Sequence, residues 1–425
     1  MTFNRREFLK LTAAGAALSG LAGLSGCASA VKPAGHVVVV GGGYGGATAA
    51  KYIRLWSEGR IDVTLIERNP KFISCPVSNL VLAGEKTLAD ITFDYDGLKK
   101  HGVRVIQGEV SGVDNDKRTV KLVSGDTVSY DRLLLSPGID FLYDSVPGLT
   151  REISESHIPH SWKAGPQTLA LRKQLEDLKD GGLVAITIPK APYRCPPGPY
   201  ERASLIAHYL KTTKPKSKVL ILDANPDITS KKGLFTKVWN DQYKGILEYR
   251  NEQTITALDP ATRTLRFEFG DPVKADVLNL IPPQIAGGIA KPFINKNKLW
   301  VGVDWLSLET EVAKNVHVIG DATFSAPGMP KSGHMANSQA KVAAAAIINL
   351  LTGQPVNPEP VVNNTCYSFV DNLNAVHVAS VHTYDAKDKT FKAVAGAGGL
   401  SAAPSELEGK FAEGWARNIW ADTLG

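Results

Sequence analysis

The chain has 425 residues, of which 43% are hydrophobic and 21% charged. This length is too great for one small domain, so we expect two or three domains. The formal net charge is only +6, and no cluster of lysines and arginines is interleaved with aromatic residues. These properties argue against nucleic acid as a partner and favour a globular protein with a sizeable core.

Residues 1–30 predict a twin-arginine export signal. Arg5-Arg6 is followed by Phe8-Leu9-Lys10 and by an apolar run of small residues over 11–26, which is short for a transmembrane span. The pattern resembles the signal for an export route that carries proteins already folded around a cofactor. We therefore expect a periplasmic protein with a bound cofactor, in a compartment where disulfides persist.

Two processing sites remain open within this segment. Ala28-Ser29-Ala30 suits an ordinary signal peptidase and would leave Val31 as the first mature residue. Leu24-Ser25-Gly26-Cys27 instead matches a lipobox, which would place a lipid anchor on Cys27. Under either reading the mature protein works outside the cytoplasm.

A nucleotide-binding motif follows. An apolar run over 36–40, typical of a buried parallel strand, leads into glycines at 41, 43 and 46 that fit G-x-G-x-x-G. Gly41 would permit the tight turn, Gly43 would let the backbone approach a pyrophosphate, and Gly46 would allow close packing of the next helix on the strand. We expect the N-terminus of that helix to face the phosphates.

A second predicted strand, over 61–66, supports this interpretation. It ends at Glu67, 21 residues after Gly46 (67 − 46). A carboxylate at this spacing can bind both hydroxyls of an adenosine ribose. The glycines and the acid together therefore predict a complete dinucleotide site.

Two later segments indicate FAD rather than NAD. Residues 129–138, ending at Gly138, resemble the strand and turn that leave the first FAD lobe of flavoproteins with two dinucleotide-binding domains. Residues 316–322 resemble their second FAD signature, in which the aspartate, here Asp321, holds the ribityl chain. A helix predicted from Lys331 to Ile348 would place its N-terminus under the flavin pyrimidine ring.

Between these halves, residues 182–292 are typical of an inserted second α/β domain, with strands over 183–188 and 218–223. Where a nicotinamide-binding relative has a second glycine motif, this chain has the proline-rich loop 189–201. Prolines remove backbone donors and stiffen the loop, so it cannot cradle a pyrophosphate. We predict a degenerate nicotinamide-type domain and no use of NAD(P)H.

Three cysteines remain after the export segment. Cys75 follows the predicted ribose acid, Cys195 lies in the proline-rich loop, and Cys366 follows the last predicted FAD-domain helix. An odd number in an oxidising compartment suggests one disulfide and one thiol with another role. An inert disulfide and a free buried thiol remain alternatives to redox chemistry.

Around these cysteines the chain resembles the flavoprotein subunit of flavocytochrome c sulfide dehydrogenase, a relative of sulfide:quinone oxidoreductases. The matching motifs are Cys-Pro-Val-Ser-Asn at 75–79, Tyr-Arg-Cys-Pro-Pro-Gly-Pro-Tyr-Glu at 193–201, and a cysteine 45 residues after Asp321 (366 − 321). The resemblance implies that Cys75 holds FAD covalently and that Cys195 and Cys366 form a redox disulfide. It also implies that Glu201 is the catalytic acid/base.

The resemblance implies that the protein oxidises sulfide, through the disulfide and FAD, to sulfur or polysulfide and passes the electrons to a c-type cytochrome. Hydrosulfide is a soft nucleophile, and a disulfide sulfur is its natural target. A sulfide:quinone oxidoreductase remains an alternative, as does a non-catalytic flavoprotein subunit of a periplasmic sulfur-oxidising complex. We expect no metal site.

We predict an α/β fold of the glutathione-reductase-like type, with two dinucleotide-binding domains and a C-terminal α+β cap. Residues 31–150 and 293–353 would form a discontinuous FAD-binding domain. Residues 151–292 would form the degenerate nicotinamide-type domain that carries the redox loop, and residues 354–425 the C-terminal flavocytochrome-type domain.

The C-terminal end predicts one amphipathic helix. Leu407, Phe411, Trp415 and Ile419 recur at helical spacing, and such an apolar stripe is expected to face the core. The polar face carries charges of both signs, which argues against a lipid surface.

Overall fold

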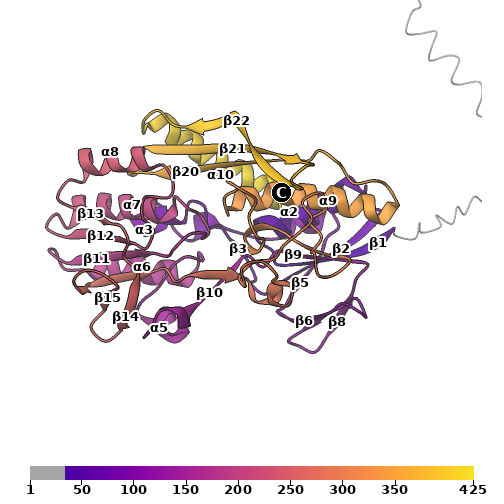
Figure 1. Cartoon of the computed structure of the whole chain (residues 1–425), viewed down its shortest axis with the longest axis horizontal. Helices are drawn as coiled ribbons and strands as arrows, with labels where there is room; N and C mark the ends of the chain where they lie inside the picture. The colour runs from indigo at the N-terminus through magenta and orange to yellow at the C-terminus, as the bar shows by residue number, and fades with distance from the viewer. Residues whose placement is uncertain (1–33) are drawn as a thin grey trace, which may run out of the picture. The chain divides into compact units, whose positions relative to one another are not determined.

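The computed structural model describes residues 34–425, so the predicted export signal and Cys27 lie outside the described residues. Within this part the chain forms two parallel sheets, each covered by helices, and a third, antiparallel sheet that packs against helices of both lobes (Figure 1). Among residues 34–425, no helix has the length and apolarity required to cross a membrane.

The first sheet builds the predicted nucleotide-binding lobe. Its strand order is β19-β9-β1-β2-β5, and every pairing is parallel. The strands are β1 (Gly35–Val40), β2 (Ile61–Glu67), β5 (Arg104–Gln107), β9 (Arg132–Leu135) and β19 (Val316–Val318). Helices α2 (Tyr44–Trp56) and α9 (Gly333–Thr352) pack against each other on this lobe. Because β19 pairs with β9, the chain returns after residue 300 to complete the sheet.

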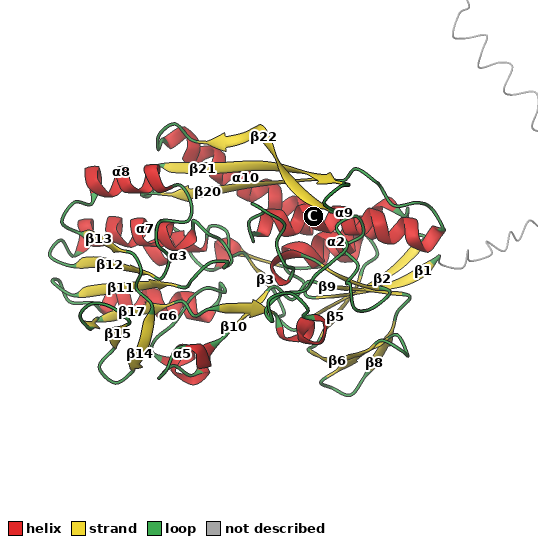
Figure 2. Ribbon diagram, viewed as in Figure 1, coloured by secondary structure: helices red, strands yellow, loops and turns green. Residues whose placement is uncertain are grey.

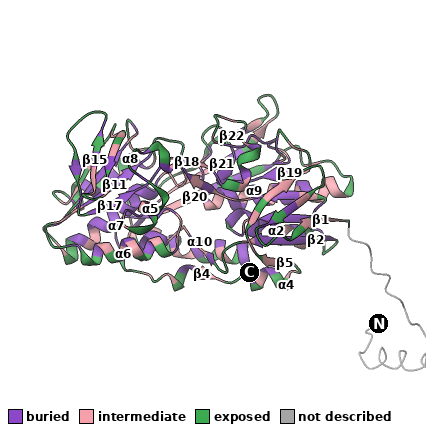
Figure 3. Ribbon diagram, turned by 90° about the horizontal axis from the view of Figure 1, so that it is seen from below, coloured by how far each residue is buried: buried purple, intermediate pink, exposed green. Residues whose placement is uncertain are grey.

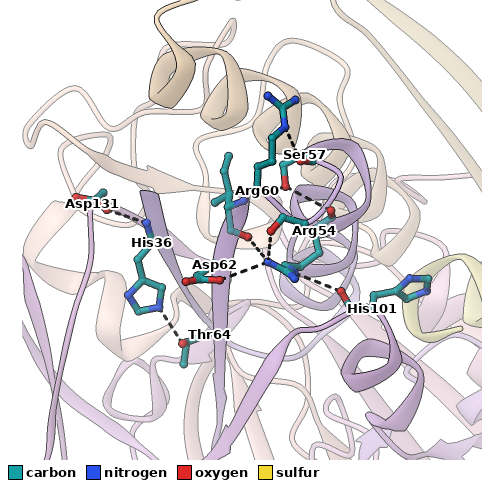
Figure 4. A network of polar contacts seen from close by, with 10 residues as sticks. His36, Arg54, Ser57, Arg60, Asp62, Thr64, His101 and Asp131 are labelled. Carbon is teal, nitrogen blue, oxygen red and sulfur yellow. Dashed lines mark hydrogen bonds and ion pairs between the residues drawn. The ribbon is translucent and has the colours of Figure 1, made fainter. Parts of the chain in front are cut away.

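Hydrogen bonds from Arg54 fix the end of α2 against the strand that follows it (Figure 4). The guanidinium donates to the carbonyls of Gly59 and Ile61 at 2.9 and 2.7 Å, and to that of His101 at 3.3 Å. These three carbonyls belong to the turn before β2, to β2 itself and to the end of α4 (Asp96–Lys100). One arginine thus connects three elements at the edge of the lobe.

The second sheet belongs to the inserted domain. Its order is β13-β12-β11-β17, again all parallel. The strands are β11 (Leu183–Ile188), β12 (Lys218–Asp223), β13 (Leu247–Arg250) and β17 (Val277–Leu280), and the helices are α6 (Pro166–Asp177), α7 (Gly198–Thr213) and α8 (Lys232–Gln242). β11 and β12 coincide with the predicted strands. The antiparallel pair β10 (Ile139–Phe141) and β18 (Gln284–Ala286) joins the two lobes.

Smaller elements complete these lobes (Figure 2). They are β3 (Phe72–Ile73), β4 (Thr92–Phe93), β6 (Val110–Asp114), β7 (Thr119–Leu122), β8 (Thr127–Ser129), β14 (Ile255–Asp259), β15 (Thr264–Phe267), β16 (Val273–Lys274), α3 (Ser78–Ala83), α5 (Arg151–Ser156), and the short helices η1 (Ala89–Ile91), η2 (Tyr143–Ser145), η3 (Gly288–Phe293) and η4 (Gly320–Ala322).

The C-terminal segment forms the third sheet and a helix. Strands β20 (Val361–Phe369), β21 (Ala375–Asp385) and β22 (Thr390–Leu400) are antiparallel, and α10 (Glu406–Leu424) packs on α2 and β21. Figure 3 shows buried residues gathered on α2, α7 and β11 and exposed ones along the outer turns. The predicted fold class, with two dinucleotide-binding domains and a C-terminal domain, is confirmed.

The prediction that the apolar stripe of α10 faces the core is right for Ile419, which is 5% exposed, and wrong for Leu407 and Phe411, which are 58% and 52% exposed. The buried side of the helix also carries Gly409, Ala412 and Ala416. A Cβ on Gly409 would lie only 2.0 Å from the carbonyl oxygen of Leu373. Small residues therefore allow the helix to pack with its backbone close to its neighbours, and this outweighs burial of the larger side chains.

Candidate active site

A cavity of about 680 Å³ lies at the carboxyl ends of the first sheet's strands, a typical size and place for a cofactor in such a fold. The sequence-predicted residues that line it are Gly41, Gly43, Glu67, Cys75, Gly138 and Asp321. They come from five separate features of the sequence. The fold thus brings together the glycine motif, the ribose acid, the first cysteine, the turn at Gly138 and the second FAD signature.

The glycine motif shows why each position excludes a side chain. A Cβ on Gly46 would lie 1.8 Å from the carbonyl oxygen of Gly41, so this glycine permits close contact of α2 with the turn. Gly41 has a φ of +99° and would place a Cβ 2.4 Å from the carbonyl oxygen of Ser136. A Cβ on Gly43 would meet no protein atom within 4 Å, and Gly43 faces the cavity. Its open side is therefore reserved for a ligand.

Two carboxylates suit the two ends of a bound FAD. Glu67 ends β2 and accepts hydrogen bonds from the backbone N–H groups of Gly42 and Asn69 at 2.6 and 2.8 Å, which hold it at the cavity wall. Asp321 is buried, burial raises its pKa, and its Oδ1 has no hydrogen-bond partner among the described residues. A buried unpaired acceptor is costly unless a ligand hydroxyl satisfies it, so these residues fit FAD.

Lys331 lies differently from the sequence prediction. The helix α9 begins at Gly333, because the Ser332 side chain accepts a hydrogen bond from the N–H of Met335 and caps it. Gly333 lines the cavity, but the Lys331 ammonium donates to the carbonyl of Asp321 and lies 3.8 Å from the centroid of the Trp300 ring. Lys331 therefore supports the loop that carries Asp321, and its side chain is not among those lining the cavity.

Cys75 faces the cavity from the loop between β3 and α3. The N–H of Ala164 lies 3.5 Å from its sulfur, and Arg194 lines the cavity beside it. Sequence reasoning missed Arg194 as a site residue, although it precedes Cys195 in the recognised motif. A cation between Cys75 and Asp321 increases the affinity of this part of the cavity for negative charge.

Cys195 and Cys366 come together from the second and third sheets. Cys195 precedes α7 with a φ of +57°, and Cys366 lies in β20. The three cysteines of the described chain are not bonded to one another here, so the Cys195–Cys366 disulfide implied by the resemblance stays a prediction. Protein surrounds both sulfurs although each residue keeps some exposed surface. Burial raises the pKa of Cys195 to about 12, and the nearby Cys366 and Glu201 add to this effect.

Glu201 lies in the first turn of α7 and connects this helix to the strand that carries Cys366. Its carboxylate accepts hydrogen bonds from Asn79 Nδ2 and from the N–H of Phe369, both at 2.9 Å. Phe369 belongs to the same strand as Cys366. Burial raises the pKa of Glu201, which makes its carboxylate a stronger base than that of an exposed glutamate.

Two further cations at this centre were missed from the sequence. Arg202 is buried and donates to Asn79 Oδ1 at 3.1 Å and to Asn279 Oδ1 at 2.8 Å. Lys231 is 5% exposed and donates to the carbonyl oxygen of Cys366 at 2.7 Å. Asn79 ends the Cys-Pro-Val-Ser-Asn motif, which could have indicated a role, but Lys231 belongs to no motif.

Family models match most of the chain. The model for the central domain of the sulfide dehydrogenase (flavocytochrome c) flavoprotein chain covers residues 168–282, and the flavin-binding model of flavocytochrome c sulphide dehydrogenase covers 358–424. The pyridine nucleotide-disulphide oxidoreductase model covers 35–175. A stretch of 46 residues is 56% identical to the sulfide dehydrogenase (flavocytochrome c) flavoprotein chain of Chlorobaculum thiosulfatiphilum and covers 94% of that sequence. This chain belongs to the same flavoprotein family.

More distant relatives of this chain include sulfide:quinone oxidoreductases. It is 26% identical over 304 residues to the mitochondrial sulfide:quinone oxidoreductase of Mus musculus, a match spanning 68% of this chain and 65% of that enzyme. The solved structure of the sulfide:quinone oxidoreductase from Aquifex aeolicus matches with a TM-score of 0.74 and 20% identity, over 91% of each chain. The resemblance drawn from the cysteine motifs is thus confirmed, and the chain is an FAD-binding flavoprotein related to sulfide:quinone oxidoreductases.

Proposed function

We propose that this flavoprotein oxidises sulfide through a Cys195–Cys366 disulfide and passes the electrons to a c-type cytochrome outside the cytoplasm. The observation that carries the proposal is the meeting of Cys195, Cys366 and Glu201 where the central lobe and the C-terminal sheet join. The family is named after a flavocytochrome c, and several relatives are named for sulfide as substrate. The predicted twin-arginine signal supports the location.

The chemistry follows from the residue types. Glu201 accepts a proton from hydrogen sulfide, and the hydrosulfide attacks one sulfur of the disulfide. The S–S bond breaks, leaving a persulfide on one cysteine and a thiolate on the other. A further hydrosulfide takes the outer sulfur as hydrodisulfide and the disulfide reforms as two electrons leave the pair. Bound FAD supplies a two-electron acceptor that can release electrons singly to haem.

Turnover by the purified holoprotein tests this function. Sulfide should reduce ferricytochrome c, followed at 550 nm, and a quinone such as decylubiquinone should be a poorer acceptor. Preferential quinone reduction would instead assign the chain to the sulfide:quinone oxidoreductases. Reduction of neither acceptor, with sulfide leaving the flavin oxidised, would indicate a non-catalytic subunit.

The position of Cys75 predicts a covalent bond to FAD. Its thiol lies on the cavity wall, next to Arg194, within the segment that matches the family motif. Acid precipitation of the protein should leave the yellow colour in the pellet, and Cys75→Ala should release it to the supernatant. Ser78→Ala, in the same segment but outside the cavity lining, is the matched control and should keep the colour in the pellet. Free release of flavin from the wild-type protein would contradict the linkage.

The second lobe predicts that NADH and NADPH are not substrates. At the end of β12, where a nicotinamide-binding lobe places its ribose acid, Asp223 is fully buried. Its carboxylate accepts hydrogen bonds from the hydroxyls of Tyr200 and Tyr249 at 2.7 and 3.1 Å and from the N–H of Asn225 at 2.9 Å. The acid is therefore occupied by the protein's own side chains. Stopped-flow mixing with excess NADH or NADPH should leave the flavin oxidised; rapid bleaching would contradict this prediction.

A further inference from the structure

Lys231 is a buried cation with no role in the chemistry described so far. It lies at the start of α8 with a φ of +57°, and its side chain crosses from the central lobe to β20 of the C-terminal sheet. Its Nζ donates to the carbonyl oxygen of Cys366 at 2.7 Å, to Ser368 Oγ at 2.9 Å and to the carbonyl oxygen of Val376 at 3.4 Å. All three acceptors are uncharged.

A buried ammonium that is hydrogen-bonded only to neutral groups is costly, and nearby negative charge offsets that cost. The titratable groups that face Lys231 are Cys366 from β20, Cys195 from the loop before α7, Glu201 from α7 and Glu408 from α10. Glu408 already pairs with His377 at 2.8 Å. The redox pair and Glu201 are therefore the groups whose charge Lys231 can balance.

The surroundings of the two cysteines are unequal. Asn364 Nδ2 donates to Cys366 Sγ at 3.3 Å, and Lys231 is bonded to the backbone of the same residue. For Cys366, burial raises the pKa, and Lys231 is the strongest influence opposing that rise. For Cys195, the neighbouring Cys366 and Glu201 raise the pKa as burial does, while Arg194 and then Lys231 lower it. Lys231 is thus the leading opposing charge at Cys366, which Asn364 also contacts, whereas at Cys195 the larger opposing influence is Arg194.

We propose that Lys231 is a positioning residue for the redox pair, whose ammonium stabilises a thiolate on Cys366 when the Cys195–Cys366 bond opens. The proposal rests on the function proposed above and gives the attack a direction. Hydrosulfide forms its bond to Cys195 Sγ, the disulfide bond breaks, and its electron pair leaves on Cys366. The persulfide is then on Cys195 and the thiolate beside Lys231.

The test measures the thiol itself and needs no sulfide turnover. In the holoprotein carrying Cys195→Ser, the pH dependence of Cys366 alkylation by iodoacetamide, read from peptide masses, reports the pKa of that thiol. Adding Lys231→Gln should raise this pKa by about one unit or more, since an oppositely charged neighbour at this range lowers a pKa by such an amount. Lys231→Arg, which keeps the charge, should restore most of the difference.

Lys232→Gln is the matched control, because Lys232 is the next residue, is largely exposed and pairs with Asp227. It should leave the pKa of Cys366 unchanged. An unchanged pKa in folded Lys231→Gln, or an equal rise in the Lys232 control, would overturn the proposal.

A second measurement keeps Lys231 in place, in case Lys231→Gln does not fold. Competitive labelling with acetic anhydride gives the pKa of Lys231 in the Cys195→Ser holoprotein, with and without Cys366→Ser. The pKa of Lys231 should fall when Cys366 is replaced, and no change would overturn the proposal. If the coupling is present and sulfide does not reduce the flavin, the proposed function fails and the pairing of Lys231 with Cys366 stands.

Discussion

Replacing Cys366 by serine should abolish sulfide-driven reduction of the flavin and leave FAD bound in a folded protein. The reason is chemical: serine cannot form the disulfide that hydrosulfide attacks, whereas Cys366 does not line the cavity whose residues fit FAD. Cys195→Ser should give the same result. Flavin absorbance after anaerobic addition of sulfide measures the effect, and we expect a loss of at least about 1000-fold in rate, as for removal of a nucleophilic residue.

Thr365→Ser is the matched control, since it changes the residue next to Cys366 in β20 and keeps both sulfurs. An inert disulfide predicts the opposite pattern for Cys366→Ser, with activity kept at low temperature and a loss of about 2–5 kcal/mol of stability. Full sulfide turnover in Cys366→Ser would remove the pair from the mechanism, and with it the main reason for proposing sulfide as substrate.

Substitutions at two glycines of the same motif should affect different properties, protein stability at Gly46 and FAD binding at Gly43. Gly46→Ala would bring a Cβ to within 1.8 Å of the Gly41 carbonyl oxygen, and backbone must move to relieve that contact. We expect the free energy of unfolding, measured with urea on the flavin-free protein, to fall by about 3 kcal/mol.

Gly43→Ala adds the same methyl group three residues earlier, at the N-cap of α2, where no protein atom lies within 4 Å of the added Cβ and the φ of −73° suits alanine. Stability of the flavin-free protein should change by less than about 1 kcal/mol, whereas FAD content per purified chain should drop severalfold because the methyl group occupies the cofactor's side of the turn. Equal loss of stability in both variants would refute this division of roles.

Much of the fold could be predicted from the sequence, because the signals are local. The apolar runs 183–188 and 218–223 became β11 and β12, and buried parallel strands require such continuous apolar stretches. The glycine motif needs only a strand, a turn and a helix in succession, and Gly46 packs as its position predicts. The motifs around the three cysteines indicated the protein family.

By itself the sequence determined the two dinucleotide-binding domains, the FAD site and the family, since each depends on residue types at short, fixed spacing. Only the tertiary structure decided which face of α10 is buried, that the Lys331 ammonium lies over Trp300, and that Lys231 reaches Cys366 across 135 residues of chain. The physical reason is that packing and burial depend on the partner surface. A helix shows its apolar stripe in its own residues, but whether that stripe or a row of small residues packs best is determined by segments far away in the chain. The same holds for a buried charge, whose function depends on the groups that the fold places around it.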